Sequence, residues 1–302
     1  LAERPDVGAQ CGLGDLQRMQ LQALGGWPQN CSVDGQPYWH GMQLDEVALP
    51  ILLAWRLWQA GLLGGQANEV YRTTVRRAAL FLARTGPVTG QERWEENGGY
   101  SPSTMAAEIT ALVCAAGFAA AAGEERLGAY FLEVADVWAS QIEHWTFTRC
   151  GALVPGHPAH YERIATVPPA GLDRDDAECR VFIALANSPT PREQASQCCI
   201  VDGGFLELVR YGVRSPDDPH VLATLPVIDA ALKVNTPCGP AWRRYNSDGY
   251  GEDADGAPYK GAGIGRAWPL LTGERGHYLL AAGGDLAPFI RAMDGFAHAG
   301  AM

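Results

Sequence analysis

The chain has 302 residues, of which 47% are hydrophobic and 19% charged, and its formal net charge is −11. This length is enough to bury one large core or two smaller ones. The acidic balance and the lack of clustered Lys and Arg argue against a nucleic-acid partner, because phosphate binding needs concentrated positive charge. We find no apolar run that reaches the roughly 18 to 20 residues that a membrane span needs, so the sequence predicts no membrane span.

Helical periodicity dominates the first half of the chain. Four stripes of apolar residues repeat at helical spacing, and Ser101-Pro102 supplies a cap and a first-turn proline for the third stripe. The stripes lie within residues 44–58, 71–82, 105–116 and 127–142. They predict four amphipathic helices that share a core.

Long loops separate the helices of the second half. Residues 147–175 and 234–271 lack periodicity and are rich in glycine and proline, and such loops commonly carry function. Helical signal lies between and after them, at residues 176–186, 203–213, 218–232, 272–283 and 285–298. We count about eight or nine helices and no convincing strand, which predicts an all-α fold of paired helices with a pocket built from the loops at one end.

Two acidic loops carry the residues best suited to chemistry. Trp94, Glu95 and Glu96 lie in RWEENGGYSPS, and Glu274 follows Trp268 in GRAWPLLTGERGHY. Hydrolysis of a glycosidic bond needs one carboxylic acid to protonate the leaving oxygen and a second carboxylate to activate water or attack carbon. The alternative for each glutamate is a solvated surface position. Because tryptophan, glycine and arginine residues surround these glutamates in the sequence, a position in a binding pocket is favoured over a solvated surface position.

Two more loops contribute candidate binding residues. Arg244 and Tyr250 lie in CGPAWRRYNSDGYGEDADG. In the same stretch, Asp253, Asp255 and Gly256 resemble the start of a calcium-binding loop, so calcium stays an alternative, although the later ligands of an EF-hand are missing. Trp27, Asp34, Asp45 and Glu46 lie in GGWPQNCSVDGQPYWHGMQLDE, where the last two acids could simply favour the positive end of the following helix.

The sequence lacks the motifs of several other common kinds of site. The eight cysteines are too sparse for a disulfide scaffold and form no CxxC pair for zinc. No GxSxG elbow, P-loop or HExxH sequence is present, and the glycines of residues 261–265 follow no predicted strand and lack the dinucleotide spacing. No cofactor is therefore expected.

The four loops, taken in chain order, resemble the bacterial branch of glycoside hydrolase family 15, which contains glucoamylases and glucodextranases. The resemblance is carried by WPQN with DGxPYWxGxQLDE, RWEExxGYSPST, RYNxDGYG and GRxWPLLTGERGHY, and it covers nearly the whole chain. It implies an (α/α)6 toroid with its pocket at one end. About eight or nine helices of roughly twelve then predict that residues 1–302 are a catalytic domain truncated at both ends.

The resemblance implies an exo-acting, inverting hydrolase that releases β-glucose from the non-reducing ends of α-glucans. Glu95 would be the general acid and Glu274 the general base. The implied sugar-binding residues are Trp94, Glu96, Arg244, Tyr250, Trp268, Trp27 and Asp34. The partner would be an α-glucan oligosaccharide or polysaccharide, and a polymer substrate suggests a secreted or periplasmic enzyme.

Four alternatives stay open, and a trehalase of the same family is the least favoured of the enzymes. A glucodextranase acting on α-1,6 links would share these motifs, because linkage preference depends on loops farther from the reacting sugar. A truncated remnant would bind glucan without hydrolysing it. A helical scaffold with incidental acidic loops would leave the Trp-Glu-Glu and Gly-Glu-Arg-Gly loops unexplained.

Overall fold

The computed structural model describes residues 25–30, 32–34, 36, 41–166, 181–188 and 193–297. The chain divides into two compact units. The first unit comprises residues 1–95 and 107–139, and the second comprises residues 96–106 and 140–302. The expectation of one truncated catalytic domain over residues 1–302 stays a prediction.

Helices build the first unit around an aromatic core. Its elements are α2 (Leu44–Gln59), α3 (Ala67–Val70), the π-helix η3 (Tyr71–Val75), α4 (Arg76–Thr85), most of α5 (Pro102–Ala121) and the first part of α6 (Glu125–Thr146). The Trp58 ring stacks on Phe118 at 4.6 Å, and Trp55 meets Phe118 edge-on at 5.7 Å. A Cβ at Gly117 would lie 2.5 Å from the Trp55 ring, so only glycine lets helix α5 come this close.

The predicted apolar stripes are largely buried. Leu44, Ile51, Tyr71 and Leu82 are fully withdrawn from solvent, as the periodicity predicts. Helix α5 begins at Pro102, directly after Ser101, as the cap and first-turn proline indicate. On the stripe within residues 105–116, Val113 departs from this pattern and is 47% exposed.

Helix α5 is long and strongly apolar. It has 20 residues, and an 18-residue window within it has a mean hydropathy of 1.6, which by length and composition suffices to cross a membrane. In the structure, 72% of that window is buried inside the protein. The prediction of no apolar run of this length was therefore wrong, and the burial is that of a core helix.

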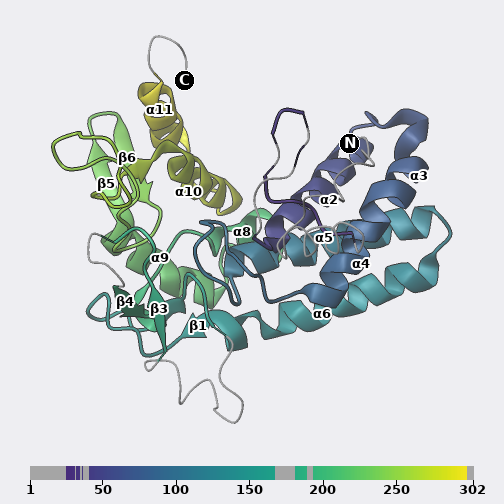
Figure 1. Ribbon diagram of the computed structural model, residues 1–302, viewed down its shortest axis with the longest axis horizontal. Coiled ribbons are helices and arrows are strands. Elements are labelled where there is room, and N and C mark those ends of the chain that lie inside the picture. Colours follow the sequence, from purple (N-terminus) through teal and green to yellow (C-terminus); the bar gives the residue numbers. More distant parts are fainter. Residues whose placement is uncertain are drawn as a thin grey trace, which may run out of the picture. The chain divides into compact units, whose positions relative to one another are not determined.

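The second unit combines helices with short strands. Its helices are α8 (Leu206–Arg210), α9 (Pro219–Leu232), α10 (Pro269–Ala281) and α11 (Ala287–Phe296), of which α10 and α11 pack side by side (Figure 1). The Asp218 side chain caps α9 by accepting the N–H groups of His220 and Val221, as its position before Pro219 predicts. The described ranges of both units contain nine α-helices, in agreement with the expected eight or nine.

Strands of two to five residues replace parts of the predicted loops. A three-stranded antiparallel sheet joins β5 (Lys233–Thr236), β6 (Gly239–Arg243) and β7 (Ala267–Trp268). The remaining strands pair in two ribbons, β1 (Phe147–Thr148) with β2 (His160–Tyr161) and β3 (Phe182–Ala184) with β4 (Gln194–Ser196). The helix predicted near residues 176–186 is wrong for residues 182–184, and residues 176–180 lie outside the described part. Strands this short offer too few residues for an alternating pattern to show.

Candidate active site

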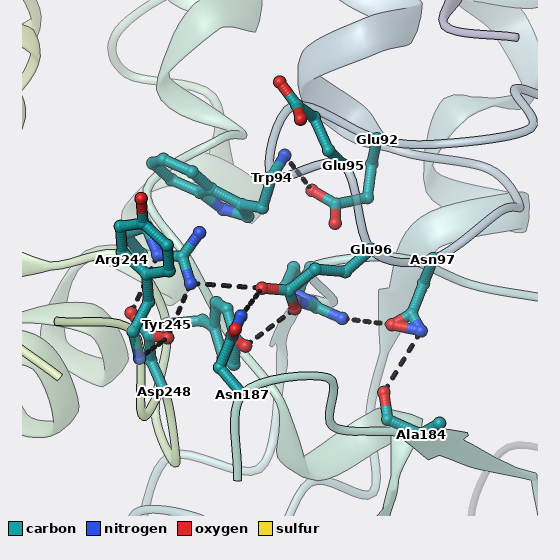
Figure 2. A network of polar contacts seen from close by, with 12 residues as sticks. Glu92, Trp94, Glu95, Glu96, Asn97, Ala184, Asn187, Arg244, Tyr245 and Asp248 are labelled. Carbon is teal, nitrogen blue, oxygen red and sulfur yellow. Dashed lines mark hydrogen bonds and ion pairs between the residues drawn. The ribbon is translucent and has the colours of Figure 1, made fainter. Parts of the chain in front are cut away.

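The Glu96 carboxylate lies at the centre of a buried polar network in the second unit (Figure 2). Its Oε1 accepts from Asn187 Nδ2 at 2.5 Å and from Arg244 Nη2 at 3.1 Å. Its Oε2 accepts from Arg163 Nη1 at 3.0 Å and from the Tyr245 hydroxyl at 2.7 Å. The Glu96 side chain is only 4% exposed, so two arginines offset the cost of burying its charge.

Arg244 connects this network to an aromatic surface. Its Nε and Nη2 donate to the two oxygens of Asp248 at 2.8 and 2.7 Å. The guanidinium carbon lies 4.6 Å from the centroid of the Tyr250 ring and 5.8 Å from that of Trp268. Tyr250 is 41% exposed, and the tilted rings of Tyr250 and Trp268 lie 6.0 Å apart. Aromatic rings beside a buried arginine are suited to hold a polyhydroxylated sugar.

The small sheet explains how two distant motifs meet. Strands β6 and β7 pair so that Trp242 faces Trp268 and Arg243 faces Ala267. Arg244 directly follows β6, and Trp268 ends β7 immediately before α10. The motifs around residues 244 and 268 are therefore fixed to one another by backbone hydrogen bonds.

Glycines let the loops of this site approach closely. A Cβ at Gly249 would lie 1.9 Å from the Asn187 carbonyl oxygen. Gly265 has a φ of +63°, and a Cβ there would lie 2.0 Å from the Asp248 carbonyl oxygen. Within the glycine-rich run at residues 261–265, Gly265 thus serves close packing against Asp248.

Glu95 occupies an unusual backbone conformation in the first unit. Its φ is +63°, a left-handed value that residues other than glycine adopt rarely and at a cost. The turn is held by the Glu95 N–H, which donates to the Glu92 carbonyl at 2.7 Å, and by the Trp94 N–H, which donates to the Glu92 carboxylate at 2.9 Å (Figure 2). Trp94 is 9% exposed and buried, whereas Glu95 is exposed. Residues held in such strained backbone conformations cluster at active sites and ligand-binding turns.

Glu274 lies in the second turn of helix α10 in the second unit, and its side chain is buried. Several contacts hold this helix, including Arg275 Nη2 to Asp229 Oδ2 at 3.1 Å and Thr272 Oγ1 to the Pro240 carbonyl at 3.0 Å. A cavity of about 10 Å³ includes Glu274 in its wall. This volume suits about one water molecule and is far too small for a sugar ring.

Two further predicted residues lie in the first unit, and the possible calcium loop lies in the second. Trp27 is partly buried, and Asp34 is exposed in a turn, where it accepts a hydrogen bond from Ser32 Oγ. The possible calcium loop is a hydrogen-bonded turn in which Asp255 accepts the Ala257 N–H at 3.0 Å. Among the residues that the structure describes, no group of three or more His, Cys, Asp or Glu side chains could hold a metal ion.

Comparison with known proteins decides the family. The family described as "Glycosyl hydrolases family 15" matches residues 13–287. The chain belongs to glycosyl hydrolases family 15. A glucoamylase of Clostridium sp. (strain G0005) is 47% identical over 273 residues, which are 90% of this chain and 36% of that protein. This family 15 chain thus spans little more than a third of the length of that relative.

Several solved structures resemble this family 15 chain, among them two glucoamylases. The crystal structure of a bacterial glucoamylase complexed with acarbose is 46% identical, with a TM-score of 0.83, over 95% of this chain and 40% of that one. A glucoamylase from Saccharomycopsis fibuligera shares the fold at 17% identity, with a TM-score of 0.52, over 82% of this chain and 50% of that one. These likenesses confirm the predicted all-α fold of the (α/α)6 toroid class, of which the chain spans a part.

The structure also shows site residues that sequence reasoning missed. The network around Glu96 also includes Arg163, Asn97 and Asn187. Arg163 and Asn187 lie outside the four motifs, and Asn97 lies within one but was assigned no role. Arg163 lies in the first long loop, 67 positions from Glu96. No local signal marks it, because its contacts exist only in the folded chain.

The burial of three acidic side chains in the first unit was not expected from the sequence. Burial raises the pKa of Asp45, and it raises the pKa of Glu108 well above the usual range. The pKa of Glu46 is raised to about 8 by burial and by the negative charges of Asp45 and Glu95. Asp45 and Glu46 are therefore more than acids that favour a helix N-terminus. Glu108 could have been found, since it lies on the same helical stripe as Met105, Ile109 and Leu112.

Proposed function

We propose that the protein is an exo-acting glycoside hydrolase that removes glucose from the non-reducing ends of α-glucans with inversion of configuration. Membership of family 15 and the likeness to glucoamylases over most of the chain support this activity. An α-glucan oligosaccharide is the proposed substrate class, in keeping with the acarbose bound to the bacterial glucoamylase.

The observation that carries the proposal is the site around Arg244. A buried carboxylate network fixes the guanidinium beside Tyr250 and Trp268, and Tyr250 is open to solvent. The arginine fork can donate to sugar hydroxyl groups, while the rings offer flat apolar surface to the sugar. Such a site binds a neutral, hydroxyl-rich ligand.

The proposed chemistry assigns one carboxyl group to each half of the reaction. Glu95 donates a proton to the glycosidic oxygen as the bond to the anomeric carbon breaks. Glu274 takes a proton from the water that attacks that carbon from the opposite face. Trp94 and Asp34 of the first unit, with Trp27, are proposed to contact the sugar chain. Glu274 belongs to a helix held in place by Arg275 and Thr272, which favours a fixed orientation for the base.

Glucose release from maltotriose and isomaltotriose tests the proposal, using the natural polypeptide that carries this chain. We expect glucose and maltose from maltotriose, and loss of at least about 10³-fold in kcat for both Glu95→Gln and Glu274→Gln, because each removes a group that transfers a proton. Faster cleavage of isomaltotriose would indicate a dextran-degrading enzyme instead. Release from neither sugar, or full activity of either variant, would overturn the proposal.

A further inference from the structure

Two neighbouring thiols lie in the second unit, outside the residues of the proposed sugar site. Cys198 and Cys199 end the short 3₁₀ helix η4 (Gln197–Cys199), and their Sγ atoms lie 3.9 Å apart. A disulfide bond spans about 2.0 Å, so the two sulfurs are close neighbours that are not bonded to one another. Cys198 is buried and Cys199 is partly exposed, so a small reagent can reach the pair through Cys199.

The backbone at Cys199 is joined to the segment that carries the sugar-binding arginine. The Cys199 carbonyl accepts from Asn246 Nδ2 at 2.8 Å, and Asn246 Oδ1 accepts the Val201 N–H at 2.8 Å. Asp202 and Tyr245 form an isolated antiparallel bridge. Because Tyr245 and Asn246 directly follow that arginine in the chain, a movement of the Cys199 backbone reaches the sugar site through two residues.

The carbonyl of Cys198 has a buried partner of its own. His160 Nε2 lies 3.1 Å from the Cys198 oxygen, and burial lowers the pKa of His160 to about 4. A carbonyl oxygen only accepts, so the neutral ring carries its proton on Nε2 and donates it. The peptide between the two cysteines is thus held from inside the protein, and turning this peptide breaks the bond to His160.

A bond between the two sulfurs would strain this peptide. Neighbouring Cα atoms are about 3.8 Å apart, whereas residues joined by a disulfide are usually roughly 4.4 to 6.8 Å apart. A ring through Cys198 and Cys199 therefore closes only if the peptide between them twists, which reorients the Cys198 carbonyl and pulls on the Cys199 backbone. Strained disulfides are more easily reduced than structural ones and are the labile, regulatory kind.

We propose that Cys198 and Cys199 are a reversible oxidation site, and that their disulfide loosens the Asn246 contact and weakens the sugar site. Hydrogen peroxide is the proposed oxidant. The Cys199 thiolate attacks one peroxide oxygen, the O–O bond breaks, and the leaving hydroxide takes up a proton to become water. The Cys198 sulfur then attacks the resulting sulfenic acid and displaces a second water, so that two thiols and one peroxide give one disulfide and two waters.

The other described cysteines differ from this pair and supply controls. Cys114 is buried in helix α5, and burial raises the pKa of its thiol to about 11, so its reactive thiolate is scarce. Cys150 and Cys238 are exposed, and the Cys238 thiol donates to the Gly295 carbonyl at 3.0 Å. Cys150→Ser and Cys238→Ser therefore remove exposed thiols that do not belong to the pair.

The test treats the natural polypeptide that carries this chain with one equivalent of hydrogen peroxide and follows mass and activity together. We expect a proteolytic digest to yield the peptide that contains both cysteines lighter by two hydrogen atoms, and dithiothreitol to restore its mass. In parallel, kcat/KM for maltotriose should fall about 5- to 10-fold, as for the loss of one hydrogen bond, and recover with dithiothreitol. The effect on kcat/KM rests on the proposed function, whereas the mass result does not.

The variants separate this site from other oxidation. Cys199→Ser should keep the activity of the reduced protein and lose the response to peroxide. Cys150→Ser and Cys238→Ser should respond as the unaltered protein does. An equal loss of activity in Cys199→Ser would show that peroxide inhibits elsewhere and would overturn the effect on the sugar site.

The digest gives the outcomes that contradict the oxidation site. Two unchanged thiols, a disulfide to another cysteine, or oxygen added to Cys199 alone would each show that Cys198 and Cys199 do not join. A disulfide at the pair with unchanged kcat/KM would overturn its coupling to the sugar site. If the reduced protein hydrolyses no α-glucan, the proposed function fails, and the digest still decides whether the disulfide forms.

Discussion

Arg244 donates to both oxygens of Asp248, at 2.8 and 2.7 Å, while its guanidinium carbon lies 4.6 Å from the centroid of the Tyr250 ring. The flat guanidinium makes an edge-on contact with the carboxylate and a face-on contact with the ring at the same time. Burial alone would lower the pKa of Arg244, but the Asp248 and Glu96 carboxylates raise it by more. The guanidinium therefore stays positively charged.

Arg244→Lys should weaken catalysis while the protein stays folded. A lysine ammonium cannot pair with both oxygens of Asp248 and stack on Tyr250, so the donors that would face a sugar lose their orientation. We expect kcat/KM to fall by about 10- to 100-fold, as for the loss of one or two hydrogen bonds to a charged group. Arg214→Lys is the control, because Arg214 also pairs with a glutamate, Glu143 of helix α6, at 2.8 Å. Equal kinetics for both variants would contradict the role of Arg244.

Gly265→Ala should disturb the same site from the backbone side. The added Cβ would lie 2.0 Å from the Asp248 carbonyl oxygen, at a φ of +63°. Gly256→Ala is matched, because Gly256 has a φ of +83° with nothing within 4 Å of the added Cβ. Both variants should lose about 1 kcal/mol of unfolding free energy from backbone strain. Gly265→Ala should lose more than Gly256→Ala, because its Cβ would also clash with the Asp248 carbonyl oxygen. Only Gly265→Ala should also lower kcat/KM, and a loss of activity in both, or in neither, would contradict this explanation.

Glu108→Gln should change how stability depends on pH. Burial raises the folded-state pKa of Glu108 well above the ordinary value of 4.5. Above pH 4.5 the unfolded chain therefore loses the proton while the folded protein keeps it, so wild-type stability falls as pH rises toward the folded-state pKa. Glutamine has no proton to lose, and the variant should gain on the wild type by up to about 1.4 kcal/mol per pH unit.

Urea unfolding of both proteins at pH 5, 6 and 7 measures this difference. Glu124→Gln is a control whose free-energy difference from the wild type should stay constant between pH 5 and 7, since the Arg76 ion pair and the Tyr71 hydroxyl lower the pKa of Glu124. Its stabilising contribution is present above pH 4.5 and is lost as pH falls below that value. A free-energy difference for Glu108→Gln that stays constant with pH would show that Glu108 is ionised in the folded protein.

Sequence periodicity predicted the helices well where apolar residues repeat over several turns. The buried positions Leu44, Tyr71 and Leu82 follow directly from that pattern. Strand β3 was missed because its three residues, Phe182–Ala184, are stabilised by pairing with β4, and a strand this short has no visible alternation of its own. The burial of α5 depends on neighbours that no local pattern reveals.

Site residues were predictable where unusual residue types lie together in the sequence. Glu96, Arg244 and Tyr250 stood out beside glycines and aromatic residues, and the structure places Arg244 in contact with both of the others. Arg163 could not be predicted, because its partner is 67 residues away and its own loop has no motif. The charge of Glu96 requires such a partner once it is buried, but sequence alone does not show which cation supplies it.

The anomer released in the first moments of maltotriose hydrolysis tests the central claim most directly. Proton NMR of the reaction, run with the natural polypeptide that carries this chain, distinguishes α- from β-glucose before the two interconvert. Attack by a water that Glu274 activates, on the face opposite the bond that Glu95 protonates, predicts β-glucose first. Initial release of α-glucose would contradict the account, because it requires a covalent intermediate and a carboxylate that acts as nucleophile.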